Sequence, residues 1–178
     1  FNKGVLMNVG TIIADDKTTH YCFHDVDLLP ASNECNYSYV NGVTKLATKV
    51  SQFGFQHRPL PPLELGGVVL IDKESFIKIN GWCNEYRGWG IEDDDFGERC
   101  LAKKINIEQR NGTYISLPHE TRGDTLGGTT PYSKINNQKY LDNAKKTNSL
   151  FDSGLNNVKY EISSKEQKEN YLLIKVKT

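Results

Sequence analysis

The chain opens on a helical pattern of apolar side chains and continues with short apolar runs. Among residues 1–14 the apolar positions have the spacing of one helix face, and they are Phe1, Val5, Leu6, Val9, Ile12 and Ile13. Residues 20–24 predict a short buried strand that ends at residues 25–27, and residues 28–30 are expected to leave it for a loop. The apolar run 68–71 follows two glycines, which predict a tight turn feeding another strand.

Capping and charged residues bound the predicted helices. Asp72 can accept a hydrogen bond from the first turn of a helix over 73–79, which stops at Gly81. A further helix is predicted over 96–104, because acids precede it and lysines end it, as the helix macrodipole favours. Residues 134–150 also have a helical pattern.

The remaining chain alternates between strands and irregular segments. Short strands are expected at 105–109, 113–117, 158–163 and 171–177. The proline-rich stretch 58–62 must be irregular. Because strands and helices are interleaved, the sequence predicts one α/β domain over residues 1–178.

Composition narrows the class of partner. The 178 residues carry 22 Lys or Arg against 22 Asp or Glu, so the basic surface of a nucleic-acid-binding domain is not expected. No run approaches the roughly 20 apolar residues of a membrane span, so membrane association would need an anchor outside this chain. The four cysteines lack the spacing of a zinc ribbon, and one or two disulfides stay open.

Two aspartates one residue apart follow the first predicted strand. Asp25 and Asp27, separated by Val26, could hold a hard divalent cation together with a diphosphate, because the cation neutralises charge that carboxylates alone would repel. The pair could equally be a solvated loop with two acids. A phosphatase-type nucleophile and acid also use this spacing, although Leu28 and Leu29 depart from the residues that such a site usually has.

A tryptophan between two glycines precedes four consecutive acids. Trp89 offers a flat apolar platform on a flexible hinge, which suits the apolar face of a sugar ring. The acids at 92–95 exceed what a helix dipole needs and repel one another. They could bind sugar hydroxyls, or they could simply stabilise the start of a helix. His119 follows a predicted strand and is a candidate further metal ligand, although a lone histidine is more often structural.

Taken together and in order, these segments resemble the β-1,4-galactosyltransferase family. The matching blocks span nearly the whole chain: 1–3, 6–10, 24–30, 66–67, 79–81, 88–90, 92–95 and 154–156, with Tyr160. The most specific blocks are 88–95 and 25–27. The stretches 24–30 and 154–160 are most similar to the xylose-acceptor branch, which builds the proteoglycan linker.

The resemblance implies a chemistry and a fold. The fold would be the glycosyltransferase A-type, a Rossmann-like nucleotide-sugar-binding fold. The reaction would be an inverting, Mn²⁺-dependent transfer of galactose or N-acetylgalactosamine from a UDP-sugar to a saccharide hydroxyl, forming a β-1,4-type linkage. Asp27 and His119 would bind the metal. Asp93, with Glu92 beside it, would be the catalytic base at a helix N-terminus, facing a cleft shared with Trp89.

The resemblance also divides the site into two groups of residues. The donor-binding group would be Phe1, Asn2, Lys3, Asp25, Val26, Asp27, Glu64 and Trp89. The acceptor-binding group would be Gly90, Ile91, Glu92, Asp93, Asp94 and Lys139.

Several positions depart from the family pattern. Lys3 stands where Arg is usual, and Ile91 stands where many members have Gly. Glu64 occupies the place of an aromatic or aliphatic residue that helps to choose the donor sugar, which leaves the donor open. Ser116 and Thr121 stand where some members supply further metal ligands, so the metal site is expected to be one protein ligand short.

The family's catalytic domain begins ahead of the segment that Phe1 matches. The chain therefore resembles the C-terminal part of that domain, and we expect it to be a poor catalyst by itself. Two other classes stay open, a sugar-binding or inactive module that retains only the acceptor site and an unrelated metal-dependent phosphotransfer domain. A eukaryotic member would face the Golgi lumen, and a bacterial or viral one would be cytoplasmic.

Overall fold

The computed structural model describes residues 2–58, 64–118 and 131–178. These residues include four α-helices and two 3₁₀ turns: α1 (Lys3–Ile13), α2 (Lys73–Lys78), α3 (Glu92–Ala102), α4 (Pro131–Thr147), η1 (Ser51–Phe53) and η2 (Leu155–Asn157). All four predicted helices are present. Across the described segments, no helix has both the length and the apolar character needed to cross a membrane.

Local signals explain where the helices begin. The side chain of Asn2 accepts a hydrogen bond from the Val5 amide and caps α1, and Asp72 caps α2 as predicted. Helix α3 begins at Glu92, ahead of the predicted range 96–104, and the prediction of acids at its start is confirmed. Because the preceding residue turns the chain with a φ of 77°, the acids themselves form the first helical turn.

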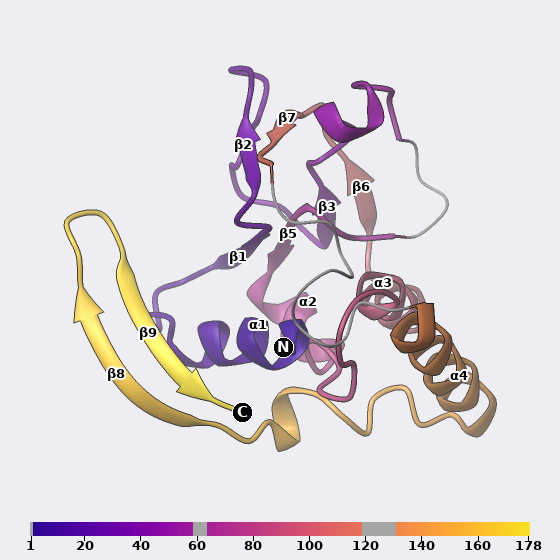
Figure 1. The fold of residues 1–178 in the computed structure, drawn as a ribbon. Coiled ribbons are helices and arrows are strands. Elements are labelled where there is room, and N and C mark those ends of the chain that lie inside the picture. The colour runs from indigo at the N-terminus through magenta and orange to yellow at the C-terminus, as the bar shows by residue number, and fades with distance from the viewer. Residues whose placement is uncertain (1, 59–63, 119–130) are drawn as a thin grey trace.

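A four-stranded sheet forms the centre of the molecule (Figure 1). Its order is β1 (His20–His24), β5 (Val68–Asp72), β3 (Val43–Lys45) and β6 (Ile107–Gln109). Strand β5 runs antiparallel to both neighbours, whereas β3 and β6 are parallel. Among the described strands β1 lies at an edge, and only Phe23 of β1 is buried. The prediction of a strand at 20–24 is therefore confirmed in position and wrong in burial.

A smaller sheet joins segments that are distant in the sequence. Its order is β2 (Leu28–Pro30), β7 (Thr113–Ser116) and β4 (Lys49–Val50). The loop predicted for residues 28–30 is wrong, because these residues pair antiparallel with β7. This partner follows far along the chain, so no local pattern could reveal the pairing.

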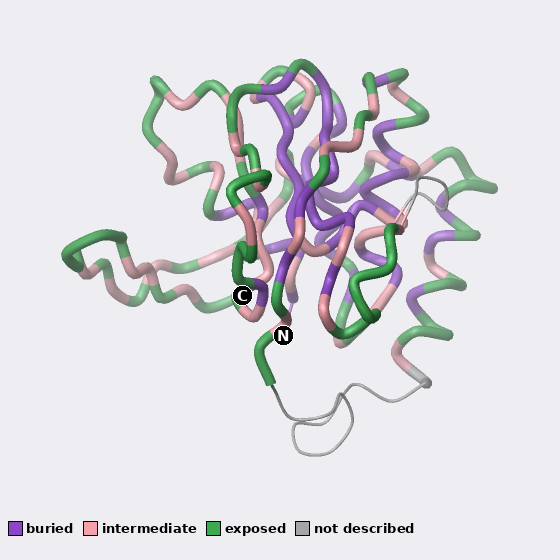
Figure 2. The backbone as a smooth tube through the Cα atoms, turned by 90° about the horizontal axis from the view of Figure 1, so that it is seen from above, coloured by how far each residue is buried: buried purple, intermediate pink, exposed green. Residues whose placement is uncertain are grey.

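The last two predicted strands form a separate hairpin. Strands β8 (Glu161–Gln167) and β9 (Leu172–Lys177) pair only with each other among the described strands. Figures 1 and 2 show this hairpin extending from the body, whereas buried backbone gathers in the middle of the molecule. The hairpin is thus remote from the core.

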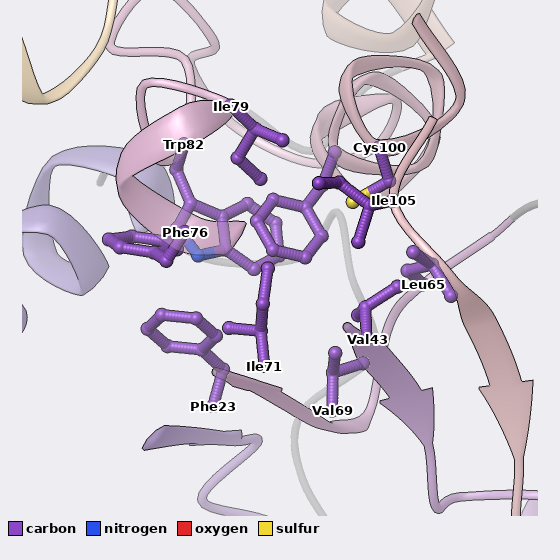
Figure 3. Packing of buried hydrophobic residues seen from close by; sticks show 11 residues of the cluster. Phe23, Val43, Leu65, Val69, Ile71, Phe76, Ile79, Trp82, Cys100 and Ile105 are labelled. Atoms are coloured by element: carbon purple, nitrogen blue, oxygen red, sulfur yellow. The ribbon is translucent and has the colours of Figure 1, made fainter. Parts of the chain in front are cut away.

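Aromatic side chains from the central sheet and the helices form the main core (Figure 3). Trp82 stacks on Phe96 of α3 with ring centroids 4.0 Å apart, and Phe23 meets Trp82 edge-on at 5.4 Å. All four cysteines are free thiols, so no disulfide contributes. The aromatic packing draws the N-terminal end of α3 toward the end of β1, where Asp25 follows.

Candidate active site

One ammonium group lies between acids from two distant segments. Nζ of Lys3, in the first turn of α1, is 2.9 Å from Oδ1 of Asp93 and 3.2 Å from Oδ1 of Asp25. It is also 3.9 Å from Oε1 of Glu92. Burial disfavours the charged form of Lys3, but the three carboxylates outweigh it and raise the pKa of the ammonium above its usual value.

A small pocket opens beside this ammonium. Its charged walls are Lys3, Asp25 and Asp93, its apolar walls include Phe23 and Trp82, and the turn at 65–67 closes one side. A Cβ atom at Gly66 would lie only 2.2 Å from Oδ2 of Asp93. The absence of a side chain at Gly66 is what lets this carboxylate approach the turn.

Asp93 lies at the N-terminus of α3, as predicted. Burial raises the pKa of its carboxyl to about 7; Lys3 acts against this rise, and Glu92 and Asp25 add to it. A general base works best when its pKa lies near the working pH. The Oε2 atom of Glu92 is buried and has no hydrogen-bond partner within the described segments.

The other two acids of this run serve different neighbours, because successive helical residues point in different directions. Asp95 accepts a hydrogen bond of 2.6 Å from Nε of Arg99, and both side chains are 1% exposed. The hydroxyl of Tyr86 donates to the second oxygen of Asp95 at 3.1 Å. Asp95, which Arg99 and Tyr86 hold, is therefore a structural residue. The pKa of the Asp94 carboxyl is raised by burial and, to a smaller extent, by the charge of Glu64.

The loop that carries Trp89 rests against α4. Nζ of Lys134 lies 5.3 Å from the centroid of the Trp89 ring, and Nδ2 of Asn137 donates to the carbonyl of Gly90 at 2.8 Å. Trp89 is 38% exposed and is not among the residues that line the pocket beside Asp93. Trp82 lies in the wall of this pocket, and a cleft shared by Asp93 and Trp89 stays a prediction.

The approach to the predicted metal site is partly described. The Leu117 amide donates to the carbonyl of Asp27 at 2.7 Å, so the chain leaves β7 beside Asp27 and continues toward His119. His119, Thr121 and Phe1 lie outside the described residues. Over residues 2–58, 64–118 and 131–178, no three His, Cys, Asp or Glu side chains are grouped to hold a metal ion.

The remaining candidates lie at the margins of the site. Glu64 forms an ion pair with Arg58, and its backbone carbonyl accepts a hydrogen bond of 2.7 Å from Nζ of Lys45. Val26 is 96% exposed, and Lys139 is exposed on α4.

Sequence reasoning missed a junction of asparagines next to Lys3. The Nδ2 of Asn2 donates to the Asn84 carbonyl at 2.6 Å, and Nδ2 of Asn8 donates to Oδ1 of Asn84 at 3.0 Å. Asn84 in turn donates to the Gly154 carbonyl at 2.8 Å. These bonds give Asn2 a structural role, and its place in the donor site stays a prediction. No spacing in the sequence marks them, because the partners come from three separate segments.

Comparisons with known proteins agree with this geometry. A family model described as the N-terminal domain of galactosyltransferase matches residues 44–120. The chain is 30% identical to beta-1,4-galactosyltransferase 7 of Drosophila melanogaster over 91% of its length and 49% of that protein. It is 35% identical to beta-1,4-galactosyltransferase 2 of Cricetulus griseus over 78% of its length and 39% of that protein. The chain thus spans less than half of these relatives.

Solved structures extend the similarity over the whole chain. One is the catalytic domain of Drosophila β1,4-galactosyltransferase 7 in complex with xylobiose, which is 27% identical and superposes with a TM-score of 0.75. The match covers 99% of this chain and 74% of that one. A mutant of the same Drosophila protein, in complex with manganese, UDP-Gal and xylobiose, superposes with a TM-score of 0.69 at 25% identity.

Proposed function

This chain belongs to the β-1,4-galactosyltransferase family and has the glycosyltransferase A-type fold, and we propose that it transfers galactose from UDP-galactose to a saccharide hydroxyl. The transfer would invert the anomeric centre, form a β-1,4-type linkage and depend on a divalent cation. The Drosophila protein crystallised with manganese, UDP-Gal and xylobiose supports this choice of donor, metal and acceptor class.

The observation that carries the proposal is the meeting of two carboxylates at one pocket. Asp25 follows β1, where the resemblance expects the nucleotide sugar, and Asp93 begins α3, where it expects the acceptor. Both lie within 3.2 Å of the same Lys3 ammonium. A transferase must hold the donor and the acceptor hydroxyl next to each other, and the proximity of Asp25 and Asp93 supports this proposal.

Asp93 is the residue that we assign to proton transfer. Its pKa of about 7 lets the carboxylate form take a proton at neutral pH from the attacking hydroxyl, which then displaces the diphosphate in one step. The unpartnered Oε2 of Glu92 would accept a hydrogen bond from a neighbouring sugar hydroxyl and orient the ring. Closure of the loop around Trp89 would exclude water.

Asp27 and His119 are the residues that would hold the metal. Carboxylate oxygens suit Mn²⁺ and histidine is a common metal ligand. The hydrogen bond from the Leu117 amide to the Asp27 carbonyl supports the proximity of Asp27 and His119. When bound, the cation would neutralise charge on the diphosphate leaving group.

Glu64 bears on the choice of donor sugar. Its carboxylate forms an ion pair with Arg58, so charged side chains stand before the turn at 65–67. We propose galactose as the donor sugar and treat UDP-N-acetylgalactosamine as the competing donor in the test.

Asp93→Asn tests the proposal in a transfer assay with UDP-galactose, Mn²⁺ and xylobiose. We expect turnover to fall by about 10²- to 10⁴-fold, the usual contribution of a general base, while donor binding by calorimetry persists. In the same assay Asp27→Ala should remove the response to Mn²⁺. Glu98→Gln, on the outer face of α3 with Lys145 as its partner, is the matched control and should transfer at the wild-type rate.

Two results would contradict the proposal. Equal turnover in Asp93→Asn would remove Asp93 from the reaction. Binding of xylobiose without transfer from either UDP-sugar would favour a sugar-binding module.

A further inference from the structure

Lys3 contacts both halves of the candidate site, and its geometry points to a task besides donor binding. We propose that Lys3 is a positioning residue for Asp93: its ammonium fixes the orientation of that carboxylate and supplies the positive charge that lets it ionise in the buried site. This inference rests on the proposed function, in which Asp93 is the base.

The two oxygens of Asp93 have different surroundings. Oδ1 receives a hydrogen bond of 2.9 Å from Nζ of Lys3. Oδ2 points to the turn at Gly66, where a Cβ atom would lie 2.2 Å away. With Oδ1 held by the ammonium, Oδ2 remains directed at the one wall that has no side chain, and it is the oxygen that we assign to accept the proton.

Lys3 itself is held firmly. Asn2 caps the helix directly before it and also donates to the Asn84 carbonyl. Gly4 lies so close to the loop at Cys83 that a Cβ would be 2.1 Å from the Cys83 carbonyl oxygen. The ammonium also lies 5.7 Å from the centroid of the Trp82 ring. The contacts of Asn2 and Gly4 fix the backbone around Lys3, and the Lys3 side chain is only 14% exposed.

The charge balance makes the ammonium necessary. The groups that act on Asp93 are Lys3 from α1, Asp25 after β1, its neighbour Glu92 in α3, and Lys45 from β3. Burial and the two acids favour the protonated form of Asp93, and Lys3, at hydrogen-bond distance, opposes them. Removal of Lys3 would leave Asp93 beside two acids, and among the described residues Lys45 would be the cation that still favours its ionisation.

The test follows the Asp93 side-chain carboxyl resonance by ¹³C NMR across pH, using Asp93→Asn to identify the signal. In Lys3→Met we expect the midpoint to rise by at least about one pH unit, because loss of a contacting opposite charge shifts a carboxyl pKa by about 1–3 units. In Lys3→Arg, which keeps the charge, it should stay within about half a unit. Lys145→Met, which removes an exposed lysine from Glu98 of the same helix, should leave it unchanged.

A second measurement serves if Lys3→Met does not fold. In the unsubstituted chain, the ¹H–¹⁵N signal of the Lys3 ammonium should move with the same midpoint as the Asp93 carboxyl, and Asp93→Asn should abolish that movement. The proposal would be overturned if the Lys3 ammonium signal did not move as Asp93 titrates. It would also be overturned if folded Lys3→Met had the same Asp93 midpoint as the parent chain.

Kinetics separate this role from nucleotide binding. If Lys3 sets the state of Asp93, Lys3→Met moves the acidic limb of the pH profile of kcat upward and Lys3→Arg restores it. If Lys3 only binds the donor, Lys3→Met raises the KM for UDP-galactose equally at every pH and leaves the titration midpoint of Asp93 unchanged. That result would refute the inference. The NMR arms require no transfer, so failure of the proposed function leaves them informative.

Discussion

Asp93, which we propose as the base, also bears on the stability of the fold. Its pKa is about 7 in the folded protein, against 3.8 for an ordinary aspartate. The folded state therefore holds this proton more tightly than the unfolded chain. The contribution of protonated Asp93 to the free energy of unfolding is fully present below about pH 4, and it is lost as the pH rises through about 7.

We therefore predict that Asp93→Asn stabilises the protein more at pH 8 than at pH 4.5. Three pKa units at about 1.4 kcal/mol each set a ceiling of about 4 kcal/mol on this difference, and relaxation of the acidic cluster should reduce it. Urea unfolding at the two pH values measures it. The exposed Glu98→Gln should change stability by less than about 1 kcal/mol at either pH. A variant that loses stability specifically at pH 8 would show that the carboxylate form stabilises the fold.

At the scale of elements, the packing of α1 depends on one of its two glycines. A Cβ at Gly4 would meet the Cys83 carbonyl oxygen at 2.1 Å, whereas a Cβ at Gly10 would meet nothing within 4 Å. Both glycines lie in the same helix, so alanine substitutions at the two positions separate steric fit from helix propensity. The close approach at Gly4 is also what brings Lys3 to the acids.

We predict that Gly4→Ala destabilises the protein by at least about 1–3 kcal/mol, the usual effect of overpacking, because the contacted atom is backbone and cannot rotate away. Gly10→Ala should stabilise it by about 0.5–1 kcal/mol through helix propensity. Denaturant midpoints of the two variants check this. Equal midpoints would mean that α1 can shift freely against the loop at 83.

At the scale of the whole molecule, the C-terminal segment has two parts with different tasks. Residues near 153–157 bind buried groups: the Ser153 carbonyl accepts a hydrogen bond of 2.8 Å from Arg99, and Gly154 accepts from Asn84. The hairpin of β8 and β9 contributes no residue to the three hydrophobic clusters of the described chain. The body should therefore depend on the first part and not on the second.

We predict that ending the chain after Tyr160 changes the melting temperature by only a few degrees. Ending it after Phe151 should cost at least about 3 kcal/mol, because buried donors of Arg99 and Asn84 lose their acceptors, at about 1–3 kcal/mol each. Thermal and urea unfolding of the two truncations test this. Unfolding of the chain that ends after Tyr160 would show that the hairpin is part of the cooperative unit.

Local chemistry explains the elements that could be predicted. The apolar stripe of α1 and the Asp72 cap of α2 involve residues within a few positions of each other, so their spacing in the sequence is their spacing in space. The same reasoning failed for Leu28–Pro30, because its partner β7 lies far along the chain. It also failed for the burial of β1, which depends on how many strands flank it.

The candidate chemical groups could be read from residue types and spacing: the Asp25 and Asp27 pair, the acids at 92–95 and the tryptophan before them. Their neighbours became known from the fold. It turned Asp95 to Arg99 as a buried structural pair and brought Lys3 to Asp93. The physical reason is that protonation and pairing depend on burial and on charges a few ångströms away, and those neighbours come from segments that only folding brings together.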